Sequence, residues 1–194
     1  MRAALVNRPA VADARLPRSF YARGTVEVAR DLLGKIIRHG RASARIVETE
    51  AYLGIGDAAA HSARGPTPRT KVIFGPPGHV YVYLIYGMHH CLNIVAEPEG
   101  VAGCVLIRAV EPVSAAPGIA PPSNGPGKLT RALGITLHHY GVDLTRGPIT
   151  LHQPADQESF AIGISPRIGI SQAADLPLRF FIRGNRFVSR EPRR

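Results

Sequence analysis

Two carboxylates and a tyrosine share one face of a predicted strand. Residues 45–53 read RIVETEAYL, and side chains two apart in a strand point the same way, so Glu48, Glu50 and Tyr52 lie together. The opposite face carries three residues that suit the core: Val47, Thr49 and Ala51. A carboxylate beside an aromatic ring fits a site where an acid–base group works next to a stacked planar group. The alternative is a solvated sheet face on which the tyrosine is incidental.

A second cluster holds three of the six tyrosines of the chain. Tyr81, Tyr83 and Tyr86 come just before Gly87. Strand tyrosines are commonly half-buried packing residues, and that explanation suffices for any one of them. Three together in a basic chain also suit platforms on which nucleic-acid bases stack. The residues alone leave both interpretations open.

A lone arginine interrupts the apolar run CVLIRAV at residues 104–110. An unpaired charge inside a dry strand costs several kcal/mol. Arg108 therefore needs a buried partner or a nearby site, and Glu50 is the candidate partner.

Metal and cofactor chemistry finds little support. The histidine pairs at 89–90 and 138–139 are adjacent residues, whose rings diverge on a strand or a helix. Cys91 and Cys104 form no CxxC or zinc-ligand pattern, and the HxE and PCxxC signature of zinc-dependent base deaminases is missing. We expect two buried thiols in a reducing compartment, no metal and no cofactor.

The three lysines, Lys35, Lys71 and Lys128, lie apart in sequence from Glu50 and from the tyrosines. A Schiff-base mechanism needs a nucleophilic amine in the site, so we do not expect one. The segment GPGKL at 125–129 lacks the spacing and the hydroxyl of a nucleoside-triphosphate loop. Nucleoside triphosphate binding is therefore excluded.

The formal net charge of the 194 residues is +10, which indicates a polyanionic partner. Only three of the 24 basic residues are lysines, and the planar guanidinium of arginine suits bidentate phosphate contacts. High genomic GC content explains the arginine bias equally well. The N-terminus lacks the apolar core of a signal peptide, and no apolar run approaches the ~20 residues of a membrane span. We expect a cytoplasmic protein with no membrane partner.

The elements that must position these residues follow a mixed pattern of short helices and strands. Thr25 is expected to cap a helix that ends at Gly34, and a second short helix is expected over 128–133. A long surface loop is expected over 54–79. The expected strands are a hairpin over 35–53, antiparallel segments over 80–95 and 101–110, and residues 178–184. The pattern predicts an α+β fold.

One domain is expected over residues 17–191, because a chain of this length can bury one sizeable core. Residues 1–16 are expected to form a loosely ordered tail. The segment 112–127 is rich in proline and glycine and is expected to be a flexible linker.

Several motifs, in order along the chain, resemble the alkyladenine (3-methyladenine) DNA glycosylase family. They are RIVETEAYLG at 45–54, His61, YVYLIYGM at 81–88 with Cys91 and Asn93, VLIRAVEP at 105–112, GPGKL, PRIGI at 166–170 and LRFFIRG at 178–184. The likeness extends from about Ser19 to Ser189. It implies one compact domain with a central curved, mostly antiparallel β-sheet, short flanking helices and a projecting β-hairpin.

The resemblance also implies roles for individual residues. Glu50 activates the attacking water, which Arg108 and the backbone carbonyl of Ile168 hold. The flipped base lies between Tyr52 and His61 on one side and Tyr83 on the other.

Three further roles follow from the same likeness. Asn93 crowds the two-amino group of guanine, Tyr86 is the wedge that enters the minor groove, and Met88 lies beside it. The histidines at 89 and 90 and the Pro/Ala-rich linker depart from the vertebrate members, so DNA contacts there are expected to differ.

The implied activity is that of a monofunctional, monomeric DNA glycosylase associated with the nucleoid. Its partner is duplex DNA that contains alkylated or deaminated purines. The hydrolysis passes through an oxocarbenium-like sugar, which an ionised Glu50 both faces and supplies with activated water. The alternatives are a non-catalytic nucleic-acid-binding module and a small-molecule nucleosidase.

Overall fold

Strand β3 (Ala42–Tyr52) is the strand from which the candidate site is built. The computed structural model describes residues 11–113, 123–155 and 158–189. β3 pairs with β2 (Ile36–His39) along its first residues and with β9 (Arg179–Ile182) farther on, while β6 (Cys104–Pro112) lies along its other edge. The register with β6 shifts around Val47, as in a β-bulge. β3 thus has neighbours on both edges, which places its charged side chains deep in the molecule.

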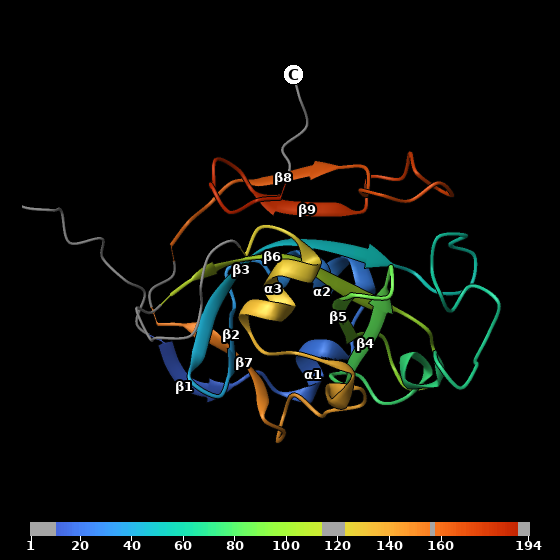
Figure 1. The fold of residues 1–194 in the computed structure, drawn as a ribbon, viewed down its shortest axis with the longest axis horizontal. Coiled ribbons are helices and arrows are strands. Elements are labelled where there is room, and N and C mark those ends of the chain that lie inside the picture. The colour runs from blue at the N-terminus through green and yellow to red at the C-terminus, as the bar shows by residue number, and fades with distance from the viewer. Residues whose placement is uncertain (1–10, 114–122, 156–157, 190–194) are drawn as a thin grey trace, which may run out of the picture.

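The described residues form a sheet of nine strands in which each pairing is antiparallel, and the main path runs β1-β7-β2-β3-β6-β5-β4. The hairpin of β8 and β9 joins it through β3 and crosses the top of the molecule in Figure 1. The remaining strands are β1 (Val11–Arg15), β4 (Val80–Ile85), β5 (His89–Val95), β7 (Ile149–Pro154) and β8 (Ile162–Ser165).

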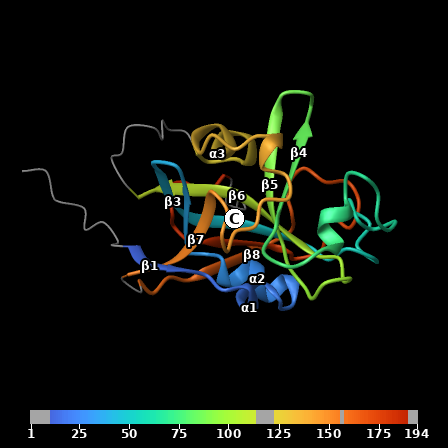
Figure 2. The same ribbon diagram turned by 90° about the horizontal axis from the view of Figure 1, so that it is seen from below.

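Short helices cover both faces of this sheet. α1 (Arg18–Tyr21) and α2 (Thr25–Asp31) lie on one side, and α3 (Pro126–Ala132) lies on the other beside the β4–β5 hairpin (Figure 2). Two 3-10 turns, η1 (Lys71–Phe74) and η2 (Leu137–His139), complete the described elements. The expectation of an α+β fold with a largely antiparallel sheet and few helices is confirmed.

The β4–β5 hairpin stands out from the sheet (Figure 2), and its tip holds an exposed aromatic ring. Tyr86 has φ +53° and Gly87 has φ +69°. A non-glycine residue with positive φ is uncommon and is found at functional sites more often than elsewhere. The left-handed turn presents the side chain of Tyr86 to solvent at 81% exposure.

Two local expectations near the N-terminus need correction. Thr25 does not cap α2; Gly24 holds the N-cap position, because the backbone N–H and the hydroxyl of Thr25 both donate to Glu97 at 2.6 and 2.8 Å. Residues 11–15, expected in the loose tail, form β1 and pair with β7. Residues 1–10 lie outside the described part of the chain.

The linker expected over 112–127 is partly ordered. Pro112 is the last residue of β6. The hydroxyl of Ser123 donates to the carbonyl of Val110 at 2.5 Å, and Asn124 forms an isolated antiparallel β-bridge with Ala109. The helix expected from residue 128 begins at Pro126, since proline is favoured in the first turn of a helix. Residues 114–122 lie outside the described residues.

The main apolar core joins the sheet to residues of both α2 and α3. It includes Val47 and Ala51, which confirms the core-facing side of β3. A smaller cluster around Tyr81 and Ile73 lies under the long loop of residues 54–79. No helix of the described segments has the length and apolar character to cross a bilayer.

Candidate active site

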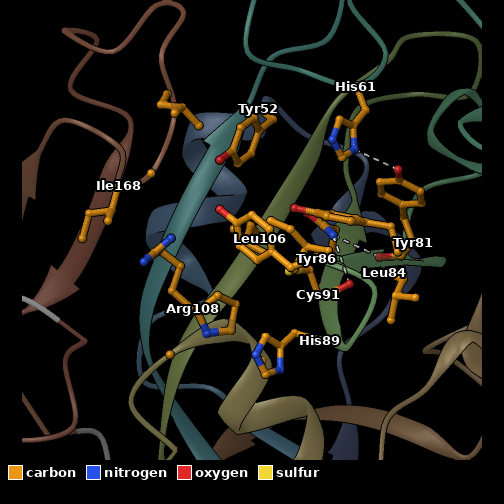
Figure 3. Close-up of a pocket in the computed structure, with 18 of the residues that line it drawn as sticks. Tyr52, His61, Tyr81, Leu84, Tyr86, His89, Cys91, Leu106, Arg108 and Ile168 are labelled. Carbon is orange, nitrogen blue, oxygen red and sulfur yellow. Dashed lines mark hydrogen bonds between the residues drawn. The ribbon is translucent and has the colours of Figure 1, made fainter.

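A cavity of about 660 Å³ opens between β3, β6, the β4–β5 hairpin, α3 and the segment around Ile168 (Figure 3). This volume lies within the range of small-molecule sites in proteins. Seven of the nine residues that the resemblance assigned line it: Tyr52, His61, Tyr83, Tyr86, Asn93, Arg108 and Ile168. The sequence motifs, which span more than a hundred residues, therefore converge on one hollow.

Glu50 lies behind the wall of this cavity and is bonded to three of the residues that form it. One carboxylate oxygen, Oε1, accepts the backbone N–H of Ile168 at 2.7 Å. The other, Oε2, accepts the hydroxyl of Tyr52 at 3.0 Å and Nη1 of Arg108 at 3.3 Å. The side chain is fully buried, so the alternative of a solvated sheet face is wrong.

Burial controls the charge of Glu50. Desolvation raises the pKa of this carboxyl above its ordinary value of 4.5, because an ion is costly to remove from water. Arg108, the Ile168 N–H and the Tyr52 hydroxyl act in the opposite direction but do not cancel the effect of burial. The expectation that Arg108 favours the ionised form holds for its own contribution, while the net direction is upward.

Arg108 is shared between two carboxylates. Its Nε donates to Glu48 Oε1 at 3.0 Å and its Nη1 donates to Glu50 Oε2 at 3.3 Å. The predicted pairing with Glu50 is confirmed, and Glu48 is the closer partner. Sequence reasoning placed Glu48 on the right face but did not assign it this contact.

An ion pair that the sequence analysis did not predict packs against the ring of Tyr52. The guanidinium of Arg167 lies over the Tyr52 ring, with Cζ 4.6 Å from the centroid. Its Nη1 and Nη2 donate to the two oxygens of Asp57 at 2.6 and 2.8 Å. The only sequence signal for this pair was the position of Arg167, next to Ile168 in PRIGI.

The opposite aromatic wall of the cavity consists of Tyr81, Tyr83 and His61. The His61 Nδ1 and the Tyr81 hydroxyl are 2.9 Å apart, and the His61 and Tyr83 rings meet edge to face with centroids 4.6 Å apart. His61 therefore contacts Tyr83, the ring that the resemblance puts on the other side of the base. A base reaches the space between these two rings only if they separate.

Burial and the nearby Arg69 shift the pKa values of His61 and Tyr81 in this wall. Arg69 lies over the Tyr83 ring at 5.2 Å, and desolvation together with the charge of Arg69 lowers the pKa of His61, so the imidazole is neutral at pH 7. Burial raises the pKa of Tyr81 to about 12. The wall thus offers neutral hydrogen-bonding groups next to a fixed cation.

Asn93 and the hairpin tip border the cavity from β5. The Asn93 side-chain amide donates to the carbonyls of Tyr81 and Cys91 at 3.1 and 3.4 Å, which fixes its orientation. Met88 is 68% exposed and lines a smaller neighbouring cavity of about 240 Å³ instead of the main one. The tip of the β4–β5 hairpin therefore exposes the Tyr86 ring and, two residues later, the thioether of Met88.

The cavity wall also carries cations, including one lysine. Lys128 is exposed and its Nζ donates to Asn124 at 3.1 Å, while Arg131 lies one turn along α3. Separation in sequence therefore did not keep Lys128 away from the tyrosines. Both cysteines are buried free thiols, and the described residues hold no group of three or more metal-ligating side chains.

Comparison with known proteins identifies the class. The model of the family described as methylpurine-DNA glycosylase (MPG) matches residues 19–186. A protein of Methanoculleus marisnigri is 50% identical over 190 residues, which cover 90% of this chain and 98% of the relative. Relatives from Chlorobaculum tepidum and Legionella pneumophila are each 46% identical, over 91% of this chain and over 91% and 98% of their own lengths. All three carry the provisional name 3-methyladenine DNA glycosylase.

The chain belongs to the methylpurine-DNA glycosylase family. Membership makes it a hydrolase of N-glycosyl bonds whose substrate is DNA. The likeness to alkyladenine glycosylases drawn from the motifs is thereby confirmed.

The buried position of Glu50 generates a pH prediction. A carboxyl that acts as a base must be ionised, and burial raises its pKa, so the rate of base release falls as pH drops through a value above 4.5. Single-turnover rates on a hypoxanthine-containing duplex between pH 4 and 8 measure this acid limb. A rate that stays level down to pH 4 contradicts the assignment of the base.

Proposed function

We propose that this protein is a monofunctional DNA glycosylase that flips alkylated or deaminated purines out of duplex DNA and hydrolyses their glycosidic bond with a Glu50-activated water. The substrates are 3-methyladenine, 7-methylguanine, ethenoadenine and hypoxanthine. Removal of the base initiates excision repair. The observation that carries the proposal is the Glu50 carboxylate, hydrogen-bonded to three residues that line a cavity of about 660 Å³, which has room for a flipped purine nucleotide.

The unused hydrogen-bonding capacity of the Glu50 carboxylate supports its proposed role in water activation. Glu50 Oε1 accepts one hydrogen bond, from Ile168, and a carboxylate oxygen can accept two. In the proposed mechanism a water that enters from the cavity beside Ile168 and Arg108 takes the second position on Oε1 and is held by the Ile168 carbonyl and Arg108. As the glycosidic bond breaks, the sugar gains positive charge, which a nearby carboxylate in a dry site stabilises.

The aromatic walls support purine binding by stacking. Tyr52 and Tyr83 come from β3 and β4, and each carries an arginine against its ring. Stacking on an aromatic side chain contributes ~1–3 kcal/mol per base. A base between these rings requires His61 to move off Tyr83, after which its neutral imidazole can bond the edge of the base.

Asn93 supports selection against normal guanine. Its amide is fixed by two backbone carbonyls at the cavity wall and cannot swing aside at low cost. A two-amino group that meets it loses hydrogen bonds to water without gaining full replacements. 3-Methyladenine, ethenoadenine and hypoxanthine lack this group. 7-Methylguanine carries it, but its positive charge makes it a better leaving group than normal guanine.

The hairpin tip supports base flipping. Extrusion of a nucleotide costs a few kcal/mol in lost stacking and pairing, least at a damaged pair. The Tyr86 ring, held outward by a left-handed backbone, can fill the gap that the nucleotide leaves. The arginines and the lysine around the cavity attract the phosphates on either side.

One prediction concerns the role of Glu50 as the base. Glu50→Gln keeps the size of the side chain but replaces one accepting oxygen with an NH2 donor, and the amide cannot take a proton from water. We expect single-turnover release of hypoxanthine or ethenoadenine from a defined duplex to fall by about 10²–10⁴-fold. Binding of the same duplex, followed by fluorescence anisotropy, is expected to persist.

The outcomes separate the alternatives. Wild-type rates in the variant contradict the mechanism, and a wild-type protein that binds lesions without releasing base indicates a binding module. Equal activity on free nucleosides indicates a nucleosidase. Strand nicking by the purified wild-type protein indicates a lyase, for which Lys128 at the cavity wall is the amine to test.

Another prediction concerns Tyr86, the proposed wedge. Tyr86→Ala is expected to weaken binding to a lesion paired in duplex DNA by about tenfold or more, because the gap left by the flipped nucleotide stays unfilled. Binding to a lesion placed in a single-stranded bulge is expected to change far less. Equal losses on the two substrates contradict the wedge.

A further inference from the structure

Glu48 is a second fully buried carboxylate on the face of β3 that carries Glu50. It accepts Nε of Arg108 at 3.0 Å and Nε of Arg179 at 2.7 Å. It also accepts the backbone N–H and the hydroxyl of Ser189 at 2.7 and 2.8 Å. These donors come from β6, β9 and the segment that follows β9, so Glu48 joins three parts of the chain behind the site.

Stability alone does not account for such a residue. A buried ion pair is often no more stabilising than well-packed apolar side chains of the same volume. Glu48 also places a second negative charge near the carboxylate that must titrate, which disfavours the ionised form of Glu50.

The geometry of Arg108 supplies an explanation. A guanidinium beside a carboxylate commonly pairs with both of its oxygens. Arg167 does this with Asp57 in the same protein, at 2.6 and 2.8 Å. Arg108 makes one bond of 3.3 Å to Glu50, because its Nε is held by Glu48.

We propose that Glu48 is a positioning residue that keeps Arg108 from forming a two-pronged ion pair with Glu50. The inference rests on the proposed role of Glu50 as the base. With Arg108 held sideways, Glu50 Oε1 stays available for water and the arginine keeps its other N–H groups toward the cavity that it lines.

The proposal has a consequence for basicity. A full ion pair with Arg108 lowers the pKa of Glu50, and a weaker base takes the water proton less effectively. Loss of Glu48 therefore makes Glu50 more acidic in two ways, through closer pairing with Arg108 and through removal of a like charge. The groups that act on Glu50 from the surrounding elements are Glu48 and Tyr52 on β3, Cys91 on β5, Arg108 on β6 and Arg167 beside Ile168.

The test is the pH profile of Glu48→Gln. In single-turnover release of hypoxanthine from duplex DNA, we expect the acid limb to move down by about one pH unit relative to wild type. The plateau rate is expected to fall about tenfold, because the base is weaker. Affinity for the lesion duplex is expected to stay within about twofold, since Glu48 lies outside the cavity wall.

Asp143→Asn is the matched control. Asp143 is a mostly buried carboxylate that accepts Arg18 Nη2 at 2.6 Å and the Thr145 hydroxyl at 2.7 Å, outside the cavity. This variant is expected to lower the denaturation midpoint without moving the acid limb. If Glu48→Gln also lowers the midpoint but leaves the acid limb in place, Glu48 is merely structural and the proposal is wrong.

A second variant guards against misfolding, because Glu48→Gln removes the negative charge that accepts the hydrogen bond from Arg179 Nε. The double change Glu48→Gln and Arg179→Gln removes both charges of the pair together, which buried sites tolerate better than the loss of one. A neutral amide oxygen binds the Arg108 Nε–H more weakly than a carboxylate does, so the downward shift is expected to persist, and its absence overturns the proposal. If wild type releases no base, the proposed function itself fails, whatever the variants do.

Discussion

The structure depends on one buried carboxylate that is held by hydrogen-bond donors from three separate segments. Glu50 contacts its own strand through Tyr52, the neighbouring strand β6 through Arg108, and a loop more than a hundred residues away through Ile168. Burial of an ionised carboxylate is expensive unless such partners are present. The same burial raises its basicity, so the feature that costs stability also supplies the chemistry.

The fold divides the work between rigid and projecting parts. Glu50, the proposed base, and its partner Arg108 lie on β3 and β6, central strands whose backbone is fixed by neighbours on both sides. The rings proposed to bind the base come from the end of β3, the long loop and β4, and the proposed wedge comes from a turn exposed to solvent. A sheet holds the reacting groups in fixed geometry, whereas loops and a hairpin can adapt to DNA.

Local sequence patterns carried much of this arrangement. The alternation of side chains along a strand placed Glu48, Glu50 and Tyr52 on one face. The lone Arg108 in an apolar strand indicated a buried partner. The antiparallel hairpins followed from β-branched and aromatic runs separated by turns. The likeness to a known family then assigned roles that periodicity cannot supply.

The contacts that were missed are long-range ones. Arg179 meets Glu48 across 131 residues and Arg167 meets Asp57 across 110, and no local periodicity encodes such pairings. Strand β1 was missed because its sequence, VADAR, has one β-branched residue and no aromatic one, so it lacks the local pattern of a strand. The bond from the Ile168 N–H to Glu50 was unforeseen because a backbone donor has no signature in the amino-acid type.

The central claim is that the Glu50 carboxylate points a water at the sugar of a flipped purine nucleotide. A crystal structure of the Glu50→Gln protein with an ethenoadenine-containing duplex tests it most directly. The account predicts a base stacked between Tyr52 and Tyr83, and a water bonded to residue 50 and facing the anomeric carbon. A lesion that stays in the DNA stack, or a sugar too far from residue 50 to share a water with it, would contradict the account.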